Sequence, residues 1–173
     1  MSYILAIDQG TSSSRAIVFD EVSNPVGEGR CPFDQIFPRD GWVEQDPEVI
    51  WSTTLDAARK AIAASPVDAA AIDAIGITNQ RETTLLWDAE SGQAVHNAIV
   101  WQDRRTAERC VQMQSDGIAS AVNEITGLVI DPYFSSTKVE WLLRDPNIQR
   151  LARADHLRFG TVDSFLVWRL TGG

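Results

Sequence analysis

Residues 4–19 have the sequence ILAIDQGTSSSRAIVF, in which two short apolar runs enclose a polar bend. The runs, 4–7 and 16–19, contain no polar side chain, as is typical of central strands that are buried on both faces. A third candidate strand, 26–33, follows the turn-forming residues 23–25. This stretch therefore predicts three antiparallel strands at the start of the chain.

A helix is predicted after these strands, because residues 46–48 have the sequence Asp-Pro-Glu. Asp is a favoured N-cap, Pro suits the first helical position, and an acid in the first turn complements the helix dipole. One apolar stripe then recurs every three or four positions, at Trp51, Leu55, Ala58 and Ile62. We expect this helix to end near Ala64.

The rest of the chain combines strand and helix patterns. Strands are predicted at 72–78, 83–87 and 98–101, with a hairpin turn at 91–92. Helices are predicted at 105–115, 119–124, 137–143 and 163–170, with Asp163 as a helix cap and Cys110 as a small buried helix residue. This order indicates an α/β protein.

The composition is that of a soluble globular protein, with 44% hydrophobic and 23% charged residues among 173. No apolar run approaches the length that crosses a bilayer, and residues 1–7 lack the basic flank and cleavage site of a secretory signal. Cys31, Cys110, His96 and His156 show no metal-binding spacing. We therefore expect a cytoplasmic protein without structural zinc or membrane insertion.

The formal net charge of -9 argues against nucleic acid as a partner, because polyanions bind to basic surfaces. The same charge limits how a nucleotide is bound. Such an acidic protein would need local donors, namely loop N–H groups and a divalent cation.

The polar bend at 8–15 has the chemistry of such a local site. Gly10 allows close backbone approach, hydroxyl and N–H groups donate hydrogen bonds, and Arg15 offers a planar donor fork. Asp8, at the end of a strand, could hold Mg²⁺. The composition fits a hydrophilic hairpin loop equally well, and neither G-x-x-x-x-G-K-[ST] nor G-x-G-x-x-G is present.

Six segments of the chain, in order, resemble the FGGY family of carbohydrate kinases, in particular its glycerol kinases. They extend over most of the sequence between Tyr3 and Gly172: 7–15, 41–44, 75–83, 97–102, 131–135 and 159–163. The resemblance implies the actin-like ATPase (ribonuclease H-like) fold, with three antiparallel strands followed by α/β units. We expect residues 1–173 to be an incomplete N-terminal kinase domain, with the C-terminal domain beyond Gly173.

The resemblance also implies a nucleotide site at the bend. ATP would be bound there through its phosphates, with Asp8 holding Mg²⁺ directly or through water. The implied phosphate-binding residues are Gly10, Thr11, Ser12, Ser13 and Arg15. Ser12 stands where the family usually has threonine, and the hydroxyl group is kept.

Four further residues match the family's glycerol site. The resemblance implies that Arg81, Glu82 and Tyr133 bind the hydroxyl groups and that Trp101 packs against the carbon chain. Glycerol is small and uncharged, so directed and charge-assisted hydrogen bonds suit it. From the residues alone, a surface ion pair, a core tryptophan and a loop tyrosine are the simpler interpretation.

The implied reaction is transfer of the γ-phosphoryl group of ATP to a terminal hydroxyl of glycerol, by a full-length protein that is a homo-oligomer. The resemblance puts the catalytic base, an Asp, beyond Gly173, so we expect no catalytic residue within this chain and no activity of the chain alone. Three alternatives stay open. One is a kinase of another sugar or polyol, another is a non-catalytic actin-like module that binds nucleotide, and the third is a truncated, purely structural domain.

Overall fold

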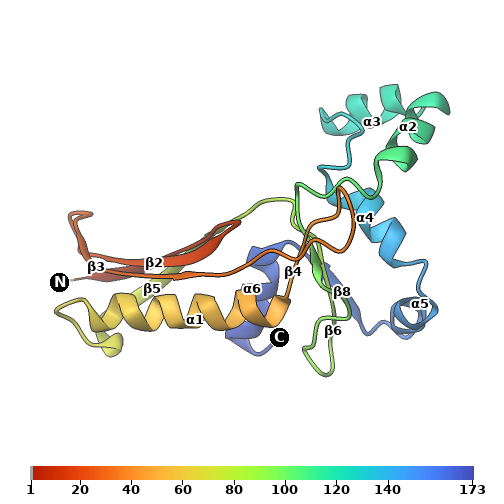
Figure 1. The fold of residues 1–173 in the computed structure, drawn as a ribbon. Helices are drawn as coiled ribbons and strands as arrows, with labels where there is room; N and C mark the ends of the chain where they lie inside the picture. Colours follow the sequence, from red (N-terminus) through yellow and green to blue (C-terminus); the bar gives the residue numbers. More distant parts are fainter. Residues whose placement is uncertain (1) are drawn as a thin grey trace. The chain divides into compact units, whose positions relative to one another are not determined.

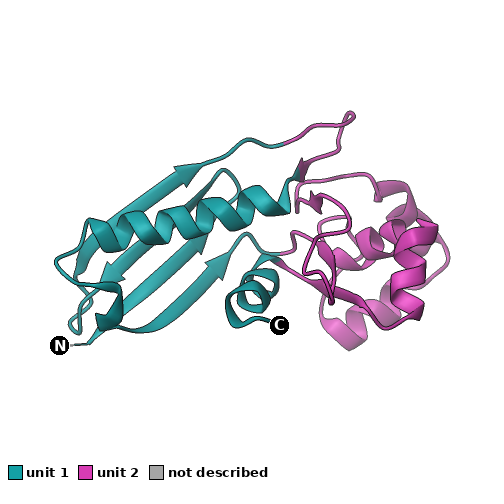
Figure 2. Cartoon of the chain, turned by 90° about the horizontal axis from the view of Figure 1, so that it is seen from below, with its two compact units in different colours: residues 1–35, 45–81, 162–172 teal, residues 36–44, 82–161, 173 magenta. Residues whose placement is uncertain are grey.

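The computed structural model describes residues 2–173 and has the α/β class that the sequence predicts (Figure 1). The chain forms two compact units, which are described separately below (Figure 2). Unit 1 comprises Met1–Gln35, Gln45–Arg81 and Val162–Gly172, and unit 2 comprises Ile36–Glu44, Glu82–Thr161 and Gly173. Within residues 2–173, no helix has both the length and the apolar character needed to cross a membrane.

Unit 1 is built on a four-stranded sheet with the order β3-β2-β1-β5. Its strands are β1 (Tyr3–Gln9), β2 (Ser13–Phe19), β3 (Pro25–Pro32) and β5 (Ile72–Asn79). The first three strands pair antiparallel, as predicted, and β5 pairs parallel with β1. A parallel neighbour requires a crossover connection, and helix α1 lies in that connection.

Helix α1 (Pro47–Ala63) confirms the predicted start and end. Asp46 caps it by accepting a hydrogen bond from the Glu48 N–H at 2.8 Å, and Ala64 is the C-cap. The predicted apolar stripe was only partly correct: Ala58 and Ile62 are partly buried and pack against the core, but the most buried residues lie one position earlier. The fully buried positions of the helix are Pro47, Ile50, Thr54, Ala57 and Ala61.

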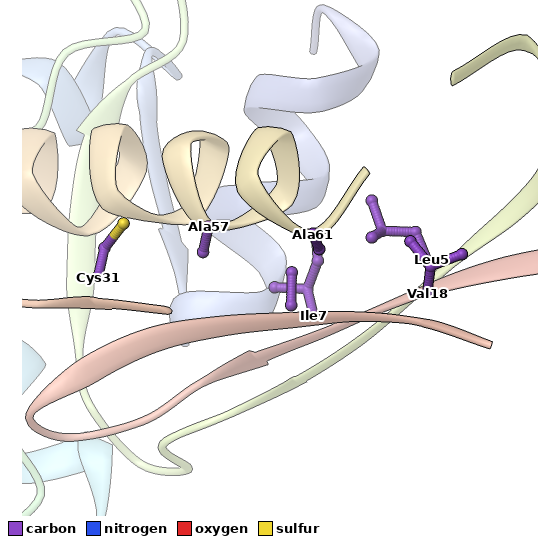
Figure 3. Packing of buried hydrophobic residues seen from close by; sticks show 7 residues of the cluster. Leu5, Ile7, Val18, Cys31, Ala57 and Ala61 are labelled. Atoms are coloured by element: carbon purple, nitrogen blue, oxygen red, sulfur yellow. The ribbon is translucent and has the colours of Figure 1, made fainter. Parts of the chain in front are cut away.

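Close packing of α1 on β3 explains this rotation. A Cβ atom on Gly29 would overlap the Ala57 carbonyl oxygen, and one on Gly27 would overlap the Ala61 carbonyl oxygen. Two glycines facing two alanines let the helix approach the sheet, which leaves larger residues such as Leu55 at the edge of the contact. The resulting core is shown in Figure 3, where its buried residues come from β1, β2, β3 and α1: Leu5, Ile7, Ala16, Val18, Cys31, Ala57 and Ala61.

Two further segments complete unit 1, a 3₁₀ turn (Ala69–Ala71) before β5 and helix α6 (Val162–Thr171). Asp163 does not cap α6 as predicted, since it lies inside the first turn. Its carboxylate instead accepts a hydrogen bond from Asn79 Nδ2 at 2.9 Å, which ties α6 to the end of β5.

Unit 2 contains short strands and four helices. Their bounds are β4 (Glu44–Gln45), β6 (Leu85–Asp88), β7 (Ala98–Ile99), β8 (Leu157–Gly160), α2 (Ala107–Ser115), α3 (Ala119–Thr126), α4 (Ser135–Leu142) and α5 (Pro146–Arg153). β4, at the boundary of the two units, pairs with β7, and β6 pairs antiparallel with β8. The predicted hairpin turn at 91–92 is confirmed. The Asp88 N–H donates to the Gln93 carbonyl oxygen and the Val95 N–H to the Leu86 carbonyl oxygen, each at 3.0 Å, on either side of a bridge between Trp87 and Ala94.

The sequence analysis missed α5 and β8. Helix α5 begins with Asp145 and Pro146, and Asp145 accepts from the Asn147 N–H at 2.7 Å, so the Asp-Pro start that identified α1 recurs here. β8 is only four residues long, and Phe159 within it is exposed. A strand of four residues is too short for its alternation to be told from chance.

A buried ion network supports unit 2. Arg105, with no exposed side-chain surface, places Nη2 2.7 Å from Glu44 Oε1 and 2.9 Å from Asp103 Oδ2. Its guanidinium lies over the ring of Trp42, 3.9 Å from the centroid. Buried charges are retained when they are paired in this way. The network therefore holds residues 41–44 against the segment that leads into α2.

Candidate functional site

The bend between β1 and β2 is a tight turn in unit 1. The Gly10 N–H donates to the Ser13 carbonyl oxygen at 2.9 Å, and the Phe33 N–H donates to the Ser12 carbonyl oxygen at 3.2 Å. Ser12 is exposed, whereas the Ser14 hydroxyl is buried and contacts Thr53 at 2.9 Å. The bend thus presents some of its hydroxyls outward and uses another to hold α1.

Three buried glutamines support the bend from within unit 1. Gln45 Nε2 donates to the Thr11 carbonyl oxygen at 2.7 Å, and Gln9 Nε2 donates to the Gly10 carbonyl oxygen at 2.9 Å. Gln80 joins them by donating to Gln45 Oε1 at 2.7 Å and to Gln9 Oε1 at 3.0 Å. A satisfied buried network of this kind makes the backbone of the bend rigid, which suits a site that must hold a charged group in one position.

Charged residues form a row across the sheet beside the bend. The strand register places Asp8 opposite Arg15, and Arg15 opposite Arg30. Directly opposite residues in antiparallel strands project from the same face. Together these three line a pocket of about 360 Å³ with Gly10, Ser13 and Glu28.

The two arginines of this pocket are held differently. Arg15 Nε lies 2.8 Å from Glu28 Oε1, in a pair of which both side chains are about half exposed. Arg30 Nε donates to the Ser13 hydroxyl at 3.0 Å, which is a neutral group of the bend. The positive charge of Arg30 makes the pocket suitable for an anion.

Three of the four predicted acceptor-binding residues lie in unit 2. The rings of Trp101 and Tyr133 pack edge to face, with centroids 5.9 Å apart. Ser135, two positions after Tyr133, donates from its hydroxyl to the Glu82 carbonyl oxygen at 3.3 Å and lies 3.5 Å from Glu82 Oε2. These contacts hold Glu82 against the start of α4, and so close to the segment that contains Tyr133.

Glu82 has a backbone conformation that is uncommon for its residue type. Its φ angle is +66°, in the left-handed region. This conformation costs free energy in a residue other than glycine. It is kept only where the surrounding structure holds it in place, which is often at a functional site. The Glu82 side chain also borders a largely apolar cavity of about 280 Å³ in unit 2.

Arg81 ends unit 1, and its side chain is exposed. It precedes Glu82 directly in the chain but belongs to the other compact unit. Its role toward the same acceptor is therefore a prediction that rests on the sequence resemblance.

The sequence analysis missed several residues of these two sites. Arg30 and the glutamines at 9 and 45 were not assigned a role, although β2 and β3 had been predicted as neighbours. The apolar runs define which strands pair, but the register that brings Arg30 beside Arg15 depends on a bulge between Val18 and Phe19. The three glutamines come from separate segments, so no local motif contains them.

Comparison with known families gives one match that extends over nearly the whole chain. Residues 3–173 match the N-terminal domain of the FGGY family of carbohydrate kinases. Among curated proteins, a glycerol kinase of Marinomonas sp. (strain MWYL1) is 58% identical over 172 residues, which are 99% of this chain. The chain spans only 35% of the length of that relative.

Two solved structures are similar to the described fold. The glycerol kinase of Plasmodium falciparum, crystallised with ADP, superposes with a TM-score of 0.94 at 32% identity, covering 100% of this chain and 35% of that one. A ligand-bound xylulose kinase of Lactobacillus acidophilus superposes with a TM-score of 0.84 at 18% identity, covering 98% and 33%. The fold is thus the actin-like ATPase fold that the sequence resemblance implied.

Proposed function

Because the chain belongs to the FGGY family of carbohydrate kinases, we propose that the full-length protein transfers the γ-phosphoryl group of ATP to a terminal hydroxyl group of glycerol. The pocket beside the bend, where two arginines lie with Asp8 and Glu28 around a rigid turn, is the observation that best supports a phosphate-binding role. The Plasmodium falciparum protein with a similar fold was crystallised with ADP, and this supports a nucleotide as the phosphate donor.

The bend would bind the phosphates of ATP through hydroxyl groups, N–H groups and guanidinium groups. Phosphoryl transfer spreads negative charge over the phosphoryl oxygens, so fixed donors and cations stabilise the transition state. The predicted contacts are Gly10, Thr11, Ser12, Ser13 and Arg15, to which we add Arg30.

Mg²⁺ would be held next to Asp8. Among residues 2–173, no group of three or more His, Cys, Asp or Glu side chains is arranged to hold a metal ion. A single carboxylate fits Mg²⁺ that keeps several waters and shares phosphate oxygens, which is its usual mode of binding in nucleotide enzymes. Bound there, the ion would neutralise charge on the transferred group.

Glycerol would be bound by Arg81, Glu82, Tyr133 and Trp101. Glu82 accepts from hydroxyl protons, Arg81 donates to hydroxyl oxygens, and the packed rings of Trp101 and Tyr133 offer an apolar wall. The 58% identity to a protein named glycerol kinase favours glycerol over other acceptors. The base that takes the hydroxyl proton is expected beyond Gly173.

The proposal is tested by measuring ADP release by the full-length protein with Mg-ATP and a panel of acceptors. We expect glycerol to support turnover with the highest kcat/KM, and xylulose, erythritol and gluconate to be poor acceptors. A higher kcat/KM for one of these would assign a different kinase activity. ATP binding without turnover on any acceptor would instead favour the non-catalytic module.

A further inference from the structure

Lys138 is fully buried, with no exposed surface. It lies on α4, between Tyr133 and Leu142, in the part of unit 2 that carries the proposed acceptor residues. Burying an ammonium group is costly, and lysine is almost never fully buried unless it is paired. An apolar side chain would fill the same space at lower cost, so the charge itself requires an explanation.

The hydrogen bonds of Lys138 point to that explanation. Its Nζ donates to the Val100 carbonyl oxygen at 2.9 Å and to the Tyr133 carbonyl oxygen at 3.4 Å. Val100 directly precedes Trp101. The ammonium group is therefore hydrogen-bonded to the backbone next to Trp101 and to the backbone of Tyr133, the two residues whose rings pack together. Thr83 holds the same strand end, because its hydroxyl accepts from the Trp101 N–H at 3.3 Å.

The charges around Lys138 also involve the acceptor site. Desolvation by burial lowers its pKa to about 8, from an ordinary 10.5. Attraction to Asp103, Glu82 and Asp131 opposes this lowering, whereas Arg105 adds to it. These four are the charged groups that act on Lys138, and one of them, Glu82, is a proposed ligand of glycerol.

We infer that Lys138 is a positioning residue, whose ammonium group holds Trp101, Tyr133 and Glu82 in the arrangement that binds the acceptor. The inference rests on the proposed function. A protonated amine has three donors and no acceptor, so it can hold two carbonyl oxygens and attract a carboxylate together. An apolar side chain at this position would leave those carbonyl oxygens without their donor and let the aromatic segments relax. A deprotonated amine would keep two N–H donors but lose its attraction to Glu82.

The first test is Lys138→Met in the full-length protein. We expect the KM for glycerol to rise about tenfold or more, with kcat changed much less and the KM for ATP within about twofold of wild type. Leu142→Ala is the matched control, because Leu142 is a buried residue of the same helix that packs into the neighbouring hydrophobic core. It should lower the melting temperature while leaving the KM for glycerol unchanged.

The second test is the pH profile of the wild-type protein, which needs no variant to fold. As Lys138 loses its proton, kcat/KM for glycerol should fall above about pH 8 toward a lower plateau, and Lys138→Met should lack this change. Loss of fold does not explain such a fall. A lysine with a lowered pKa binds fewer protons when folded than when unfolded between about 8 and 10.5, so its contribution to stability rises across that window.

The outcomes separate this inference from the proposed function. If the wild-type protein phosphorylates glycerol but its profile lacks the change near pH 8, or a folded Lys138→Met keeps the wild-type KM for glycerol, Lys138 has only a structural role. If the wild-type protein does not phosphorylate glycerol, the proposed function fails, and the inference fails with it.

Discussion

Arg30 is a candidate phosphate-binding residue because of its position opposite Arg15 in the neighbouring strand. It lies opposite Arg15 and donates to Ser13, so a second guanidinium faces the pocket beside the bend. Arg15 is already paired with Glu28, whereas Arg30 donates to a neutral hydroxyl. The guanidinium of Arg30 is therefore the one that suits an added anion.

We therefore expect Arg30→Gln to raise the KM for ATP of the full-length protein about three- to tenfold, because one unscreened charge near a phosphate is worth about 1 kcal/mol at an exposed site. The effect should shrink as salt is raised. Arg59→Gln is the matched control, since Arg59 is an exposed arginine of α1 paired with Asp56. Equal KM values for wild type and Arg30→Gln at low salt would remove Arg30 from the nucleotide site.

Arg81 allows a prediction about the acceptor. Replacing it by alanine in the full-length protein should raise the KM for glycerol about ten- to one-hundredfold, because a hydrogen bond from a charged donor contributes about 1.5–3 kcal/mol. The KM for ATP should change little. Steady-state kinetics with each substrate varied in turn measures both values, and an unchanged KM for glycerol would contradict the assignment of Arg81.

At the scale of elements, the packing of α1 on β3 depends on two glycines rather than on large apolar side chains. The backbone of α1 lies so near that a methyl group on Gly29 has no room. Helix α1 also contacts β2 beside the proposed nucleotide site, because the Ser14 hydroxyl bonds to Thr53 of α1 and Ser14 belongs to the strand that leaves the bend.

Gly29→Ala should consequently destabilise the full-length protein by about 3 kcal/mol, at the upper end of what overpacking costs. Thermal unfolding measures this as a lower melting temperature. Glu28→Ala, the neighbouring position of β3, is the comparison. Glu28 is about half exposed and its pair with Arg15 is worth little, so the cost there should stay below about 1 kcal/mol. Similar losses at both positions would refute the close contact.

For the whole molecule, the relevant fact is that the chain spans 35% of the length of the Marinomonas relative. The residues described here include candidates for binding phosphate, Mg²⁺ and glycerol. We propose that the residue that accepts the proton from glycerol lies beyond Gly173.

We expect the 173-residue chain alone to show no glycerol-dependent ADP release above background. A positioned general base raises the rate of the chemical step by about 100- to 10,000-fold. The loss of the substrate contacts expected beyond Gly173 would lower the rate further. The assay uses Mg-ATP and glycerol at concentrations that saturate the full-length protein. Turnover by the chain within about tenfold of the full-length rate would mean that the base lies among residues 1–173.

Several features could be predicted from the sequence alone because each depends on residues close together in the chain. The two apolar runs and the bend between them determine the first hairpin, and Asp46 with Pro47 determines where α1 begins. The candidate residues of the bend, and Arg81 with Glu82, were found because they lie within short ordered segments that resemble a known family.

Other features were decided only by the tertiary structure, because they depend on how segments that are distant in the sequence pack against one another. Gln9, Gln45 and Gln80 become a network only when β1, β4 and the end of β5 are brought together. The buried face of α1 follows from where two glycines of β3 allow close approach, and the burial of Lys138 follows from the packing of α4 against the strand end at Val100. Apolar periodicity limits which faces are buried, whereas close packing and hydrogen bonding between distant segments select one arrangement.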